Sequence, residues 1–240
     1  MYEHLAAFSG GLPNEYHLSL YSRWARGGWG MIITGNCQIS SSHLSLGRDI
    51  AFPSSPSTRV VDAFKALSAA MHSSGTSNVT GVDRALAIVQ LSHSGRQSPR
   101  VLGGRLGSLR GPFGPSSRRV GDDTKEGILA SVAYRLMFQA PRTLSQEDIT
   151  EVIQGFVRAA KLAFETGFDG IQLHAAHGCE FTFLDDLIKF KVRCRSPFAV
   201  SVSQGEPCAL GSGFYSWLIT AAKYPRGRVF ERNTTNKTNN

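Results

Sequence analysis

The sequence predicts an α/β fold in which helices cover a parallel sheet, and three observations indicate it. Short apolar runs without alternation recur along the chain, as expected of strands that are buried on both faces. Segments with apolar residues at three- and four-residue spacing separate these runs, which is typical of helices. Each separating segment is long enough for a right-handed crossover between parallel strands. The 240 residues suffice for one domain of this kind.

Two helix–strand pairs are expected in the first part of the chain. The first helix begins after Pro13-Asn14 and ends at Gly27-Gly28, and an apolar strand over residues 29–34 follows it. The second helix spans residues 60–73, and the second strand spans residues 85–91.

A third pair follows a long loop over residues 92–144. Ser145 is a good N-cap, because acidic residues occupy the first turn after it and complement the helix dipole. An apolar stripe continues to Gly167, which ends the helix, and the third strand spans residues 168–173.

Regular patterns weaken beyond this point. Residues 183–192 fit one more helix, and residues 198–202 fit one more strand. No period is recognisable from residue 204 onward, and the polar end is expected to be disordered. We therefore expect one domain over residues 1–203 and an irregular tail over residues 204–240.

The composition excludes several classes of protein. No run of about 18 apolar residues is present, which argues against a membrane span, and the N-terminal residues do not resemble a signal peptide. The four cysteines have no CxxC spacing, which argues against a zinc ribbon or a disulfide framework. A reduced, cytoplasmic protein is the expectation.

The net charge of +8 is concentrated in part of the long loop. Six arginines and no acidic residue lie between Ser92 and Val120. They are compatible with a solvated loop, with a site for an anion or phosphate, or with nucleic-acid binding. The last alternative is the weakest, because aromatic residues do not alternate with these arginines as they do on a base-stacking surface.

Two histidines stand at the carboxyl end of the third strand. His174 and His177 are three residues apart, at the place where parallel-barrel enzymes carry their chemistry. Together with Cys179 they include the nitrogen and sulfur ligands that zinc prefers, but no fourth ligand is evident, so no metal is expected.

Three segments resemble one known family. Gln-Leu-Ser-His-Ser-Gly-Arg-Gln at residues 90–97 is similar to a signature of the old yellow enzyme family, the FMN-dependent NAD(P)H:flavin oxidoreductases and ene-reductases. Gly-Phe-Asp-Gly-Ile-Gln-Leu-His-Ala-Ala-His-Gly at residues 167–178 resembles the second signature of that family. Residues 20–25 and 31–36 resemble the helix and strand that precede both.

This resemblance implies a partial (β/α)8 TIM barrel with FMN across its carboxyl-end mouth. It implies that Gln90 hydrogen-bonds the flavin ring and that Asn36 lies beside it. Arg96 is expected to hold either the cofactor or an acidic partner. His174 and His177 would bind the substrate oxygen, where two N–H donors stabilise the negative charge that develops as hydride arrives.

The chain also departs from the family pattern. Cys179 stands where the family has its proton-donating tyrosine, and Ser203 stands where a basic residue near the flavin is expected. Only strands two to four, or two to five, of the barrel can be recognised. An incomplete barrel exposes strand edges, so self-association through these edges is a further expectation.

The leading hypothesis is therefore an FMN-dependent oxidoreductase that passes hydride from NADH or NADPH to an α,β-unsaturated carbonyl or quinone-like compound. The first alternative is an inactive, truncated fragment of such an enzyme that binds no flavin. The second alternative is a basic nucleic-acid-binding protein that uses the arginine-rich loop.

Overall fold

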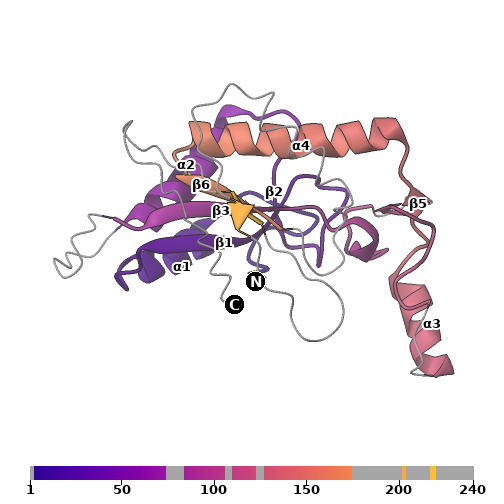
Figure 1. The fold of residues 1–240 in the computed structure, drawn as a ribbon. Coiled ribbons are helices and arrows are strands. Elements are labelled where there is room, and N and C mark those ends of the chain that lie inside the picture. Colours follow the sequence, from indigo (N-terminus) through magenta and orange to yellow (C-terminus); the bar gives the residue numbers. More distant parts are fainter. Residues whose placement is uncertain are drawn as a thin grey trace, which may run out of the picture.

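The computed structural model describes residues 3–73, 84–105, 110–122, 127–174, 202–203 and 217–219. Within them, three parallel strands alternate with helices, which confirms the predicted fold class (Figure 1). The elements of this unit, in chain order, are α1 (Glu15–Ala25), β1 (Met31–Gln38), α2 (Thr58–His72), β3 (Leu86–Ser92), α4 (Gln146–Glu165) and β6 (Gly170–Leu173).

The sheet has six strands in the order β2-β1-β3-β6-β8-β7. The short strand β2 (Ile50–Ala51) extends the parallel part next to β1. On the other side, β8 (Trp217–Ile219) pairs with β6 in the antiparallel direction, and β7 (Val202–Ser203) pairs with β8. The edge of β6 is thus occupied by a strand that runs opposite to the parallel neighbour that a (β/α)8 barrel has there.

The last predicted elements are only partly described. Of the strand expected over residues 198–202, Val202 is described and belongs to β7. β8 lies inside the segment 204–240, for which the sequence indicates no element. The helix expected over residues 183–192 lies outside the described residues.

The hydrophobic core lies between one face of the sheet and the three long helices. Phe64 and Leu67 of α2 and Phe156 of α4 are buried there, together with Val89 and Leu91 of β3. Because side chains alternate between the faces of a strand, the neighbours of Val89 and Leu91 point to the opposite face, which the helices leave uncovered.

Helix ends lie close to where the sequence predicts them. The side chain of Asn14 accepts hydrogen bonds from the backbone N–H groups of Tyr16 and His17, and it caps α1. Ser145 caps α4 in a capping box with Asp148. Gly167, with a φ of +91°, follows the end of α4, as expected of a residue that must adopt a left-handed conformation.

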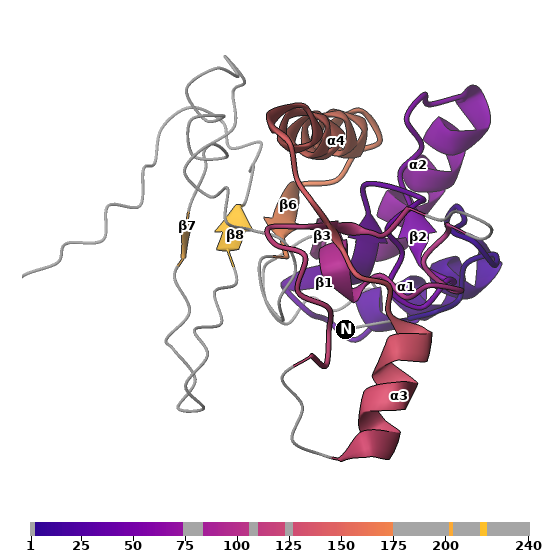
Figure 2. The same ribbon diagram turned by 90° about the vertical axis from the view of Figure 1, so that its right-hand side faces the viewer.

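The segment 92–144, expected to be a loop, contains several short elements. They are η1 (Gly95–Gln97), β4 (Phe113–Gly114), α3 (Ile128–Met137) and β5 (Arg142–Thr143). β4 and β5 form a separate two-stranded sheet. α3 extends away from the rest of the chain, and none of its residues is buried (Figure 2).

None of the helices in the described ranges is long and apolar enough to cross a membrane.

Candidate functional site

Three amide side chains stand in one row across the parallel strands. Asn36 on β1 is in register with Gln90 on β3, and Gln90 is in register with Gln172 on β6. All three lie near the carboxyl ends of their strands, on the face opposite the helices. The strands of Asn36 and Gln90 are thus paired directly, and the predicted contact of both residues with a flavin stays a prediction.

Two oxygen atoms in this row are buried without a hydrogen-bond partner among the described residues. They are Oδ1 of Asn36 and Oε1 of Gln90, in residues that are only 7% and 9% exposed. Gln90 uses its other end, because its Nε2 donates to Oε1 of Gln172 at 2.6 Å. A buried acceptor without a donor costs about 1–3 kcal/mol, so this row is suited to a ligand that brings N–H groups. FMN fits it, since its ring carries N–H and C=O groups along one edge.

A β-bulge in β1 sets this register. The pairing with β3 shifts between Ile33 and Asn36, where β1 has one more residue than its neighbour. Within the bulge, Oγ1 of Thr34 accepts the backbone N–H of Gln90 at 2.9 Å and donates to the carbonyl of Gly35 at 2.8 Å. The threonine hydroxyl thus replaces a backbone acceptor that the bulge has displaced.

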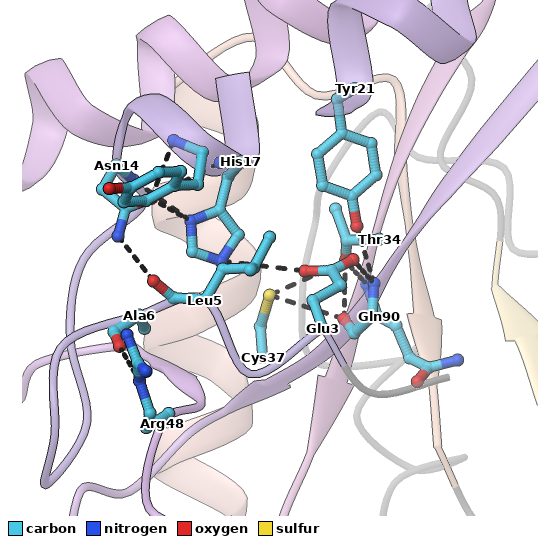
Figure 3. A network of polar contacts seen from close by, with 12 residues as sticks. Glu3, Leu5, Ala6, Asn14, His17, Tyr21, Thr34, Cys37, Arg48 and Gln90 are labelled. Atoms are coloured by element: carbon cyan, nitrogen blue, oxygen red, sulfur yellow. Dashed lines mark hydrogen bonds and ion pairs between the residues drawn. The ribbon is translucent and has the colours of Figure 1, made fainter. Parts of the chain in front are cut away.

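The backbone N–H of Gly35 has its acceptors in the N-terminal segment and in α1, and Figure 3 shows Glu3 and Tyr21 near Thr34 of the bulge. It donates to Oη of Tyr21 at 2.9 Å and to Oε1 of Glu3 at 2.6 Å. Burial raises the pKa of Glu3, while this hydrogen bond acts in the opposite direction. The shape of the bulge is therefore fixed by side chains on both of its sides.

The same buried region contains two groups that stay neutral. Burial lowers the pKa of His17 to about 4, and the neutral Nδ1 accepts the backbone N–H of Asn14 at 3.2 Å. Burial also raises the pKa of the Cys37 thiol far above its ordinary value. Cys37 is consequently an unreactive thiol of the core.

Of the proposed substrate-binding pair, the structure describes His174. It follows β6 directly, its backbone N–H donates to the carbonyl of Leu91, and it is buried. Because it lies two residues after Gln172, it projects from the same face as the amide row. His177 and Cys179 lie outside the described residues.

Arg96 is half-buried on the short helix η1, which follows β3. In the described ranges, no ion pair joins Arg96 to an acidic residue. Of its two expected roles, the contact with an acidic partner therefore has no support in this part of the chain, and the contact with the cofactor stays a prediction.

Arg105 shows that the arginine-rich segment is not solvated throughout. Its guanidinium donates to the backbone carbonyls of Ser42, Ser98 and Pro99, at 2.6, 3.0 and 3.2 Å, and the residue is 9% exposed. Burial lowers its pKa to about 10. This arginine holds the loops together and is not presented to an external anion.

A pair of histidine rings, tilted against each other, lies next to these loops, and sequence reasoning assigned it no chemical role. The rings of His43 and His93 are 4.4 Å apart, and Nε2 of His43 accepts the backbone N–H of Phe113 at 3.1 Å. Burial, followed by the charge of Arg105, lowers the pKa of His93 to about 4. Both rings are neutral packing elements near the carboxyl end of the sheet.

Gln172 is the other residue that sequence reasoning missed, although it lies inside a recognised motif. The available signal was its position two residues before His174, which puts both side chains on one face of a strand.

Comparisons with known proteins point in the same direction as this geometry. Residues 3–185 match the sequence profile of the NADH:flavin oxidoreductase / NADH oxidase family. The NADH-dependent flavin oxidoreductase iliE of Neonectria sp. (strain DH2) is 37% identical over 168 residues, which are 70% of this chain and 20% of that protein. A second iliE, from Hypocrea jecorina (strain QM6a), is 35% identical over 171 residues, covering 71% and 40% of the two chains. The chain thus spans well under half the length of these curated relatives.

Solved structures show the same fold. An old yellow enzyme homologue from Zymomonas mobilis superposes with a TM-score of 0.53 and 24% identity, over 75% of this chain and 43% of that one. Morphinone reductase superposes with a TM-score of 0.55 and 19% identity, with the same coverage. The parallel strands and their helices are therefore part of a TIM barrel.

Proposed function

Because the chain belongs to the NADH:flavin oxidoreductase / NADH oxidase family, we propose that it carries the flavin- and substrate-contacting part of an FMN-dependent oxidoreductase. The proposed reaction transfers hydride from NADH or NADPH, through FMN, to an α,β-unsaturated carbonyl compound. The observation that supports this most is the pair of buried oxygens on Asn36 and Gln90, which lack donors among the described residues at the carboxyl end of the sheet.

Asn36 and Gln90 are the groups of this chain that would hold the ring of FMN. The oxygen of Gln90 would accept the single N–H of the pyrimidine part of the ring, and the paired strands keep both amides at the same height. Arg96, on the short helix η1 that follows β3, would add a positive charge near the cofactor. The chemistry that bound FMN would supply is the transfer of hydride between the nicotinamide and the substrate.

His174 would bind the oxygen of the substrate, with His177 as its partner. An imidazole N–H that points at a carbonyl oxygen polarises the double bond and stabilises the negative charge on that oxygen. The position of His174 supports this role, because it follows β6 directly and extends the face of the amide row by one position. Cys179 stands at the proton-donor position of the family, and we retain it as the proposed donor.

The protein portion that performs these tasks would be a single domain over residues 1–203. The chain spans between 20% and 40% of its curated relatives, so catalytic turnover by this chain, its enone substrate and its reductant all belong to the proposal.

Titration of the purified chain with FMN, followed by flavin fluorescence, tests the cofactor part. We expect stoichiometric binding and a dissociation constant about three- to tenfold higher in Gln90→Leu, because one neutral hydrogen bond contributes about 0.5–1.5 kcal/mol. Gln154→Leu, an exposed substitution on α4, is the control and should leave the affinity unchanged. A chain that takes up no FMN would contradict the proposal.

Replacing His174 by alanine tests the substrate part. In the FMN-loaded chain, the affinity for a simple phenol should fall about tenfold or more, because a charge-assisted donor to the phenolate oxygen is lost. The affinity for FMN should change little. If the phenol affinity of this variant, measured through the flavin absorbance, equals that of the wild type, then His174 does not bind the substrate oxygen.

One observation favours a second candidate, a chain that keeps this fold but binds no flavin. β8 pairs with β6 in the antiparallel direction along residues Ile171 to Leu173, and it occupies the edge where a barrel has its fifth parallel strand. The expected self-association through that edge would have to displace β8. This candidate requires that the purified chain is a colourless monomer and that it does not bind added FMN.

A further inference from the structure

Gln172 hydrogen-bonds Gln90, the residue proposed to hold the flavin ring. The family motif that contains Gln172 did not lead us to assign it a role in the site. The two residues are paired in register on β6 and β3, and Oε1 of Gln172 accepts a hydrogen from Nε2 of Gln90 at 2.6 Å. This contact joins Gln90, the central side chain of the amide row, to Gln172 at one end of the row.

The contact fixes which end of the Gln90 amide is available. A glutamine side chain ends in an oxygen that accepts and a nitrogen that donates, and the two ends exchange places when the amide turns over. Gln172 holds the nitrogen end. The oxygen end is buried and has no partner among the described residues, so it is the end left for a ligand.

We propose that Gln172 is a positioning residue that makes Gln90 an acceptor toward the flavin. This inference rests on the proposed function. The pyrimidine part of the flavin ring has a single N–H group between two carbonyls, and that N–H matches the free oxygen of Gln90. If Gln90 turned over, its NH2 group would face this N–H, and two donors would oppose each other.

The backbone makes this arrangement rigid on the side of Gln90. Its N–H is held by Oγ1 of Thr34 at 2.9 Å, and its Cα lies between those of Asn36 and Gln172 in the sheet. The side chain remains to be oriented, and Gln172 provides the acceptor that holds its terminal amide.

A double-mutant cycle on the whole chain tests the inference. Gln172→Leu should raise the dissociation constant for FMN about three- to tenfold, the effect of losing one neutral hydrogen bond. In a Gln90→Leu background the same substitution should have no further effect, because Gln172 acts through Gln90. Gln154→Leu is the matched control.

NMR of the chain loaded with 15N-labelled FMN provides a readout that a purely structural role would not change. The resonance of the ring N–H nitrogen should shift when Gln172→Leu releases the amide of Gln90. Gln172→Glu keeps an acceptor at the same position, so it should retain the wild-type resonance. This variant also keeps the test decisive if Gln172→Leu does not fold.

The outcomes distinguish a failure of the positioning role of Gln172 from a failure of the proposed function. If the wild-type chain binds no FMN, both proposals are contradicted. If it binds FMN but Gln172→Leu leaves affinity and resonance unchanged, the positioning role alone is overturned. Equal losses in the wild-type and Gln90→Leu backgrounds, or a Gln172→Glu resonance that follows the leucine variant, also overturn it.

Discussion

Thr34 carries more of the site than its position in an apolar strand indicates. Its hydroxyl both accepts the N–H of Gln90 and donates to the carbonyl of Gly35. The sequence motifs led to Asn36 and Gln90, but not to the bulge that aligns them. A threonine at the end of an apolar run is common in strands, and only the neighbouring strand reveals that its oxygen replaces a backbone acceptor.

Replacing Thr34 by valine should lower the free energy of unfolding by about 1–3 kcal/mol, because the buried N–H of Gln90 would lose its acceptor. Urea denaturation measures this difference. Thr150→Val is the control, since Thr150 is exposed on α4 and its hydroxyl bonds only to the carbonyl of Gln146. An equal loss of unfolding free energy in both variants would show that the hydrogen bond of Thr34 at the bulge stabilises the fold no more than that of an exposed threonine.

Among the helices, the sequence predicted the features that depend only on neighbouring residues. Ser145 caps α4 as expected, and Asn14 caps α1 at the predicted start of that helix, because an N-cap depends only on the next three residues. α3 was missed although its sequence has apolar residues at helical spacing, among them Leu129, Val132 and Leu136. It has no side-chain cap to mark its start, and none of its residues is buried.

The cap of α4 offers a test at this scale. Ser145→Ala removes the oxygen that accepts the N–H of Asp148 and should lower the free energy of unfolding by about 1 kcal/mol. The control is Ser19→Ala, an exposed serine within α1, which should be neutral or slightly stabilising. Thermal or urea denaturation of both variants compares them directly, and identical midpoints would contradict the capping role.

For the whole molecule, buried histidines predict how stability depends on pH. Burial lowers the pKa of His17 and of His93 from 6.5 to about 4. Between these values the unfolded chain takes up protons that the folded chain does not. The two histidines should therefore leave the free energy of unfolding unchanged above pH 6.5. As the pH drops toward 4, each of them should lower it by about 3 kcal/mol.

Urea denaturation at several pH values measures this slope. His93→Phe removes one of the titrating groups and keeps an aromatic ring against His43, so its stability should fall less steeply between pH 6.5 and 4. The same slope in the variant and the wild type would contradict the assignment to His93.

The architecture of the whole molecule was predictable only as far as its strands remain parallel. Helix–strand periods and two motifs sufficed to expect a partial barrel through β6. The antiparallel pairing of β8 with β6 was not predictable, because strand direction in a short segment depends on its distant partner and not on its own residues.

The aligned strands also set the spacing of the side chains that would contact a flat ligand. Neighbouring strands lie about 4.8 Å apart, so in-register side chains repeat at that interval along a line across the sheet. The amides of Asn36, Gln90 and Gln172 follow this line. Adding or deleting one residue between Ile33 and Asn36 would move Asn36 to the helix-covered face without changing any side chain of the site. Selection at this bulge would therefore act on the number of residues as much as on their identity.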